Sequence, residues 1–140
     1  MHPHYIVRML KTIHIQTHSR TEMINVDSMV SKVVQESGVQ EGICLLWVPH
    51  TTAAVTINEN ADPDVTRDIL NETNKIIPFD NGYKHLEGNS AAHIKSTLFG
   101  PSLQLIVTKG KLLLGTWQSI FFCEFDGPRT RKLTIKVWVA

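Results

Sequence analysis

The C-terminal part of the chain contains three β-type apolar segments separated by two turns, and this pattern restricts the fold more than any other. The segments are Leu103–Val107, Leu112–Phe125 and Leu133–Val139. Lys109-Gly110-Lys111 and Asp126-Gly127-Pro128, which separate them, have the composition of tight turns. We therefore predict an antiparallel β meander, with Gly115 as a candidate bulge in its long middle strand.

Further strands are expected upstream of this meander. Alternation of polar and apolar residues predicts strands at Tyr5–Gln16 and Ala53–Asn58. The run Ile43–Val48 is continuously apolar, which is typical of a strand that is buried on both faces. This strand would deliver His50 to its end.

Helical spacing of apolar residues predicts two helices between these strands. The first follows a cap at Asn25 or Asp27 and ends at Gly38. Its apolar stripe comprises Val26, Met29, Val30, Val33 and Val34. The second starts at an Asp62 cap with Pro63 in its first position. Its buried face comprises Val65, Ile69, Thr73 and Ile76.

The stretch from His85 to His93 collects two imidazoles, a carboxylate, a glycine and an asparagine just before a third helix, Ser90–Phe99. Asn89 is its predicted N-cap, and Gly100 its end. Ala91, Ile94 and Leu98 fall on one face of this helix, and His93 on another. The free N–H groups at the helix start predict an anion site beside both histidines.

The length of 140 residues fits one domain, residues 1–140, of α+β class with extensive antiparallel sheet and about three helices. With a formal net charge of only +1, the protein has no strong electrostatic field that would attract nucleic acid or an anionic membrane, so we expect neither as a partner. Cys44 and Cys123 lie in apolar runs and are expected to be reduced core residues. Without a signal-like or bilayer-spanning apolar run, we expect a cytoplasmic protein.

Three histidines at element boundaries, His50, His85 and His93, are the best candidates for proton transfer or metal binding. With a carboxylate such as Glu87 or Glu59, they could hold zinc with an open coordination position. Their spacing matches no standard zinc motif, so hydrogen-bonded loop histidines are the alternative.

Charged residues elsewhere indicate a phosphate ligand. Arg129 and Arg131 flank Thr130 beyond a tight turn, and guanidinium groups suit phosphate oxygens, although basic residues also protect strand edges. Thr51 could add a hydroxyl group to such a phosphate site. Acidic residues around Glu59 and Asp68 could hold magnesium together with a phosphorylated substrate, or only complement a helix dipole.

Taken together, these motifs resemble the YjbQ family of uncharacterised small proteins. The matching residues, in the family's order, are His50-Thr-Thr-Ala53, Asn58-Glu59, Asp68, Tyr83-x-His85, Glu87-Gly-Asn89 through His93, Gly115-Thr-Trp-Gln118 and Glu124-Phe-Asp-Gly-Pro-Arg129-x-Arg131. They extend over about three quarters of the chain. The resemblance therefore involves most of the candidate residues named above.

This resemblance implies a compact α+β fold assembled as a homotrimer, with pockets near subunit boundaries and zinc or anions bound there. The implied site residues are His50, Glu59, His85, Asn89, His93, Glu124, Arg129 and Arg131. Family members are associated with a secondary thiamine-phosphate synthase activity, which joins hydroxymethylpyrimidine pyrophosphate to a thiazole phosphate. Glu59, Glu124 and the three histidines would then serve catalysis.

Three hypotheses follow for the function. The first is a thiamine-phosphate synthase-like transferase, in which Asn89, Arg129, Arg131 and Thr51 bind phosphate and magnesium arrives with the substrate. The second is a zinc-dependent hydrolase or phosphatase with His50, His85 and His93 as ligands. The third is a module that binds a small phosphorylated metabolite without turnover.

Overall fold

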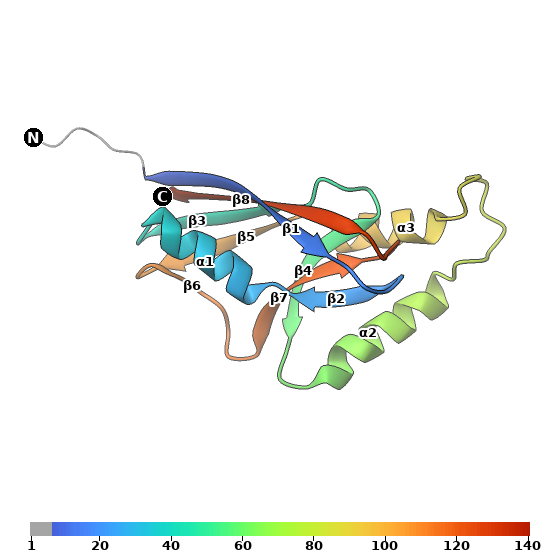
Figure 1. Cartoon of the computed structure of the whole chain (residues 1–140). Coiled ribbons are helices and arrows are strands. Elements are labelled where there is room, and N and C mark those ends of the chain that lie inside the picture. Colours follow the sequence, from blue (N-terminus) through green and yellow to red (C-terminus); the bar gives the residue numbers. More distant parts are fainter. Residues whose placement is uncertain (1–6) are drawn as a thin grey trace, which may run out of the picture.

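The protein forms two antiparallel sheets and three helices in the computed structural model, which describes residues 7–140 (Figure 1). The larger sheet, with order β1-β8-β3-β5-β6, comprises β1 (Arg8–Gln16), β8 (Thr130–Val139), β3 (Gly42–Trp47), β5 (Ser102–Thr108) and β6 (Lys111–Leu112). The smaller, with order β2-β7-β4, comprises β2 (Glu22–Asn25), β7 (Gln118–Glu124) and β4 (Ala53–Glu59). The helices are α1 (Asp27–Ser37), α2 (Pro63–Ile76) and α3 (Ser90–Phe99). The predicted α+β class is confirmed. Tyr5 and Ile6 of the first predicted strand lie outside the described residues.

The main core lies between α1, the inner face of the larger sheet and one face of the smaller sheet. Val33 of α1, Leu46 of β3 and Phe122 of β7 are fully buried in it. A second, smaller core forms on the other face of β7, where Phe121 packs with Ala92 of α3. Strand β7 is therefore the strand buried on both faces, because α3 covers the face that the main core leaves open.

Strand β3 differs from its prediction because only one of its faces is buried. Cys44 and Leu46 are fully buried, whereas Trp47 is 49% exposed and Leu45 is half-buried. The outer face of the larger sheet carries no covering element within residues 7–140, so continuous apolarity here did not mean burial on both faces. Both cysteines are free and buried as predicted, and burial raises the pKa of each thiol to about 12.

The predicted C-terminal meander is wrong beyond its first hairpin. The β5–β6 hairpin closes at Lys109-Gly110, where both residues have positive φ. The chain then leaves the sheet at Gly115, whose N–H is held by the Gln118 side chain, and β7 joins β2 and β4 in the smaller sheet. Strand β8 returns to pair with β1 and β3. The Gly115 turn thus moves the chain between sheets, where we predicted only a bulge.

The helices begin and end close to their predicted positions, but their buried faces differ. Asp62 caps α2 by accepting from the Asp64 N–H at 2.9 Å, as predicted, and Gly38 ends α1 in the left-handed conformation. The N-cap of α1 is Val26, while Asn25 accepts from the Asp27 N–H. No residue of α2 is buried, because Val65, Ile69 and Thr73 of its predicted buried face are only half-buried and Ile76 is 65% exposed. On the predicted apolar faces of α1 and α3, Met29, Ile94 and Leu98 are 38% to 68% exposed. Strand β2 was not predicted.

Helix α3 buries a face of small and polar residues. Ala91, Ala92, Lys95 and Ser96 are its buried residues, because the two alanines allow the helix to approach β4 closely. None of the three helices in residues 7–140 is long and apolar enough to cross a membrane.

Candidate functional site

Two adjoining cavities lie where β3, β4, β7 and β8 meet the start of α3. The first, which we call the arginine pocket, has a volume of about 570 Å³ and is lined by Trp47, Val48, Pro49, His50, Thr51, Thr52, Pro101, Arg129 and Arg131. The second, the histidine pocket, has a volume of about 310 Å³ and is lined by Thr51, Thr52, His85, Glu87, Asn89, His93, Asp126 and Arg129. Thr51, Thr52 and Arg129 line both. One ligand could therefore contact both pockets at once.

A buried ion pair between Arg131 and Glu124 forms the base of this region, with side-chain exposures of 2% and 0%. The Arg131 Nε donates to the two Glu124 oxygens at 2.9 and 3.1 Å, and its Nη2 donates to Glu124 and to the Thr52 hydroxyl. The carboxylate also accepts from the Thr17 hydroxyl at 2.7 Å and the Asp126 N–H at 3.0 Å. The two charges thus compensate each other, and the Glu124 carboxylate and the Nε and Nη2 groups of Arg131 all have hydrogen-bond partners.

These hydrogen bonds determine the charge of Glu124 and the donors that Arg131 keeps for a ligand. Burial alone raises the pKa of the Glu124 carboxyl, but the hydrogen bonds from Arg131, Asp126 and Thr17 outweigh it and hold the pKa below its usual value. Glu124 is therefore an anion at neutral pH that positions Arg131. Arg131 donates through Nε and Nη2, while its Nη1 has no acceptor within residues 7–140, and the residue lines the arginine pocket.

His50 has a defined hydrogen-bonding state. Its Nε2 accepts from the Lys132 backbone N–H at 2.9 Å, so that nitrogen carries no proton. Burial, followed by the positive charge of Arg131, lowers the pKa of His50. The imidazole is therefore neutral, with Nδ1–H as its free donor.

His85 and His93 form a separate pair in the histidine pocket. Their ring centroids are 5.4 Å apart with the planes nearly perpendicular, and the His85 Nε2 lies 3.9 Å from the Glu87 carboxylate. His50 lines only the arginine pocket. The structure therefore brings together two of the three predicted histidines.

The separation of the histidines bears on the predicted zinc site. Across residues 7–140, no three His, Cys, Asp or Glu side chains converge closely enough to hold a metal ion. The side chains of one chain thus do not fit a three-histidine zinc site with His50, His85 and His93 as ligands.

Asn89 occupies the N-cap position of α3, but its side chain does not cap the helix. Its Nδ2 donates instead to Asp126 at 2.9 Å, and its Oδ1 is buried without a hydrogen-bond partner. Within the described chain, the Ser90 and Ala91 N–H groups also lack acceptors, although Ala91 is fully buried. The N-terminus of α3 is therefore uncapped at the edge of the histidine pocket, which Asn89 lines.

Asp126 is the organising residue that sequence reasoning missed. It accepts from Asn89 and from Arg129, whose Nη2 lies 3.2 Å from the carboxylate and whose Nε donates to the Asp126 carbonyl at 3.0 Å. We interpreted Asp126 only as a turn residue, although it lies inside the Glu124–Arg131 motif. Arg129 remains half-exposed, and its Nη1 has no acceptor in the described residues. Its guanidinium thus keeps donors for a ligand in both pockets.

Glu59 lies away from this region. The register pairs Ala53 with Glu124 at the pocket end of β4, and Glu59 with Gln118 at the other end. Six strand steps separate the two ends, roughly 20 Å. Glu59 lines neither pocket. The acidic residues that follow it take local roles: Asp62 caps α2 and Asp64 pairs with Arg67 at 3.0 Å.

Comparison with known proteins places this chain and its fold in a family. A sequence model described as UPF0047 protein YjbQ-like matches residues 11–140. The UPF0047 protein YugU of Bacillus subtilis is 52% identical over 130 residues, covering 92% of this chain and 98% of the relative. A UPF0047 protein of Methanocaldococcus jannaschii is 49% identical over 132 residues, covering 94% of this chain and 96% of the relative.

Solved structures agree with these sequence relatives. A crystal structure of an uncharacterised YjbQ/UPF0047 family protein from Clostridium acetobutylicum has a TM-score of 0.89 and 53% identity, covering 91% of this chain and 98% of that one. A YbjQ-like protein of unknown function from Sulfolobus solfataricus has a TM-score of 0.92 and 32% identity, covering 97% of this chain and 100% of that one. The chain therefore belongs to the YjbQ-like UPF0047 family.

Proposed function

We propose that this protein is an enzyme that binds a small phosphorylated substrate across the arginine and histidine pockets. One observation carries the proposal: the uncapped start of α3 and the free donors of Arg129 meet beside His85 and His93. Helix N–H groups and guanidinium donors bind phosphate oxygens, and imidazole side chains can accept and donate protons in catalysis. The residues around the histidine pocket could thus both bind an anion and transfer a proton.

The resemblance described above suggests which reaction is involved, and we propose a thiamine-phosphate synthase-like transfer. The bond from the pyrimidine methylene carbon to the pyrophosphate oxygen breaks, and pyrophosphate leaves with the electron pair. The thiazole nitrogen forms the new bond to that carbon. Arg129 and the α3 start would stabilise the charge that develops on pyrophosphate. The apolar side of the arginine pocket, with Trp47, Pro49 and Pro101, would accept a planar ring.

Asn89 and Asp126 add a second requirement on the ligand. The buried Oδ1 of Asn89 lacks a donor, and leaving such an acceptor unpaired costs free energy. A hydroxyl, amino group or metal-bound water of the substrate complex would supply that donor. Magnesium would accompany the pyrophosphate, with Asp126 and Glu87 as the carboxylates that line the pocket.

The test is formation of thiamine phosphate by the purified protein with both substrates and excess magnesium. Arg129→Ala is expected to lower kcat/KM at least tenfold, because about 1.4 kcal/mol of transition-state stabilisation corresponds to that factor. Arg67→Ala removes an exposed arginine of α2 that also pairs with an aspartate three residues before it, so it is the matched control and should retain full activity.

Failure has distinct meanings in this experiment. If the wild type binds the thiazole phosphate and Arg129→Ala does not, but no product forms after long incubation, the protein is a metabolite-binding module without turnover. No phosphate binding by the wild type would contradict the proposed site. Wild-type turnover that is equal in Arg129→Ala would contradict the role of Arg129.

We further propose that the protein assembles as a homotrimer. Large apolar side chains stay exposed on the single chain, including Leu86 at 100%, Leu98 at 68% and Trp117 at 63%. The family resemblance implies this assembly, and subunit contacts would remove such exposed side chains from water. Native mass spectrometry should give three times the chain mass of 15.8 kDa, and a monomer at micromolar concentration would contradict this.

A further inference from the structure

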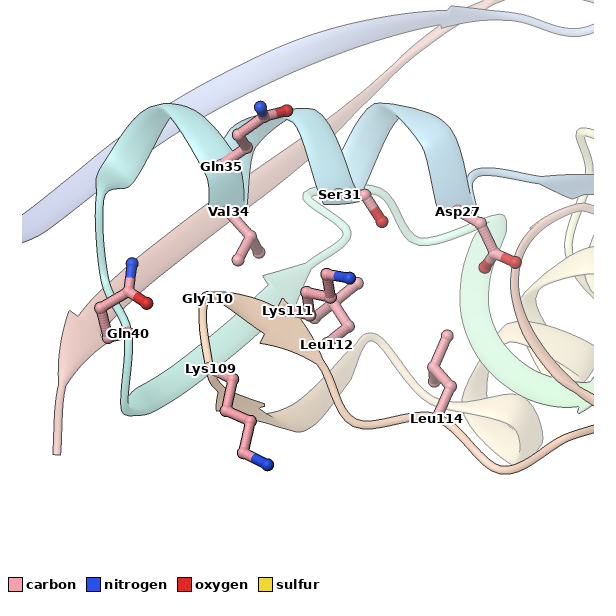
Figure 2. A pocket seen from close by; sticks show the side chains of 10 residues that line it. All are labelled: Asp27, Ser31, Val34, Gln35, Gln40, Lys109, Gly110, Lys111, Leu112 and Leu114. Atoms are coloured by element: carbon pink, nitrogen blue, oxygen red, sulfur yellow. The ribbon is translucent and has the colours of Figure 1, made fainter.

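A third cavity lies away from the arginine and histidine pockets, between α1 and the β5–β6 hairpin (Figure 2). We call it the α1 groove: it is bounded by Ser31 and Val34 on α1, by Lys111 and Leu112 of β6, and by Leu114 of the following loop. Its volume is about 620 Å³. This volume is within the range of small-molecule sites, roughly 300 to 1,000 Å³.

The groove has a defined length and shape. Asp27 lies at one end and Gln40 at the other. The lining residues of α1 are 27, 31, 34 and 35, which follow one face of the helix for about 12 Å. Leu112 and Leu114 provide the accessible apolar surface between these ends, and Val34 also lines the groove but is only 1% exposed. The cavity thus fits an extended molecule with an apolar body.

One cation faces this cavity. Figure 2 shows the Lys111 side chain between α1 and β6, with the Ser31 hydroxyl directed toward the same space, whereas Lys109 and Gln35 point away. None of the ion pairs within residues 7–140 uses Lys111. The ammonium group therefore keeps all its charge and donors for a ligand.

Asp27 is the acidic residue that lines the groove, and one of its carboxylate oxygens is committed to the fold. Asp27 Oδ1 accepts from the Ile120 N–H at 2.7 Å, which ties α1 to β7. Glu41 accepts from the Thr108 hydroxyl and the Lys109 N–H, both at 3.1 Å. These bonds hold the two walls in place.

The hairpin wall is fixed further at its turn. Lys109 adopts a positive φ of 51°, which is uncommon for a residue with a side chain, and the Gly110 N–H donates to the Gln40 carbonyl at 3.0 Å. The backbone of the β5–β6 turn is therefore held by its own contacts, and a ligand would meet a preformed wall on this side of the groove.

From this geometry we propose that the α1 groove binds an organic anion with an extended apolar body, distinct from any ligand of the histidine pocket. The anionic group lies against the Lys111 ammonium and the Ser31 hydroxyl, and the apolar body covers Leu112 and Leu114. Coulomb attraction in a partly enclosed groove selects the anion, while burial of methylene groups adds affinity.

The experiment uses hexanoate as the probe, with hexanol and hexylammonium as probes of the same chain length. Each is titrated into the full ¹⁵N-labelled chain, and backbone amide shifts are followed by NMR. Hexanoate should give saturable shifts at Ser31, Lys111 and Leu112, with no saturable shift at Asn89 or Arg129. The other two probes should bind at least about tenfold more weakly.

Two variants and one control test the assignment of residues. Lys111→Glu should weaken hexanoate binding at least about tenfold, because it replaces the attracting charge by a repelling one. Ser31→Trp should block binding without changing charge, since it fills the space beside α1. Lys32→Glu changes net charge equally on the same helix but does not line the groove, and it should bind hexanoate like the wild type. Circular dichroism confirms that each variant is folded.

The proposal is overturned by any of three results. These are equal binding of hexanol and hexanoate, unchanged binding by folded Lys111→Glu or Ser31→Trp, and hexanoate shifts confined to the histidine pocket. All three are independent of turnover at the other site.

Discussion

At the scale of single residues, the candidate site depends on which polar groups the protein uses for itself. Arg131 and Glu124 bind each other in the interior, and Thr17 and Thr52 complete their hydrogen bonds. Arg129, two residues away, is half-exposed and keeps free donors. Sequence reasoning treated the two arginines as equivalent, but burial gives Arg131 a positioning role and leaves Arg129 to meet the ligand.

Glu124→Gln should lower the free energy of unfolding by about 3 kcal/mol, because it leaves the Arg131 charge buried without a counter-charge. Urea denaturation followed by circular dichroism measures this. Adding Arg131→Met should recover part of the loss. Arg129→Ala, which removes an exposed pair with Asp126, should cost at most about 1 kcal/mol. Equal losses for Glu124→Gln and Arg129→Ala would contradict the structural role of the buried pair.

At the scale of elements, two helix starts that look alike in sequence behave differently. Asp62 caps α2 through its side chain, whereas Asn89 at the start of α3 turns its amide to Asp126. A nearby carboxylate on the chain segment after β7 thus competes with the helix for the Asn89 side chain. The consequence is that α2 is closed at its start and α3 is open to an anion.

Asp62→Ala should cost about 1 kcal/mol of stability through the lost cap. Asn89→Ala should cost less than half of that, because no cap bond is lost and an unpaired buried oxygen is removed together with one hydrogen bond. Thermal or urea unfolding of the two variants decides the comparison. If Asn89→Ala proved the more destabilising of the two, the open α3 start would be the wrong description.

At the scale of the whole molecule, a buried lysine joins segments that are distant in sequence. Lys95 of α3 is fully buried, donates to Asn74 of α2 and lies 4.5 Å from the centre of the Phe79 ring. Burial and, to a lesser degree, the charge of Arg20 lower the pKa of Lys95 to about 8. The lysine has no carboxylate partner in residues 7–140, so its protonated form weakens the folded state.

This shift makes stability depend on pH in a defined direction. Between about pH 8 and the unfolded value of 10.5, the unfolded chain holds a proton on Lys95 that the folded chain has lost. Stability therefore rises with pH across this window, by up to about 1.4 kcal/mol per pH unit. Lys95→Met removes the effect, so the free energy of unfolding of the variant minus that of the wild type should fall from pH 8 to pH 10.5.

The comparison with Lys95→Met also cancels the contributions of other ionisable groups to the pH dependence of stability. Cys44 and Cys123 have raised pKa values and make stability fall at alkaline pH, but they do so equally in both proteins. A difference that stays constant from pH 8 to pH 10.5 would contradict the assignment to Lys95.

Short-range preferences in the sequence account for most of the local elements and indicate most of the candidate residues. The Asp62-Pro63 start, the Gly38 end and the β5–β6 turn follow from backbone and capping preferences that act within a few residues. The motifs also indicated the family and the positions of Asn89 and Arg129.

The role of each of these pieces depends on the tertiary structure, because burial and hydrogen-bond competition arise from contacts between distant segments. The tertiary structure moved β7 away from β8 into the second sheet, placed His50 apart from His85 and His93, and left Glu59 at the far end of β4. Periodicity reports which residues are apolar, but not which surfaces meet. The state of a polar side chain is therefore settled only when its neighbours are known.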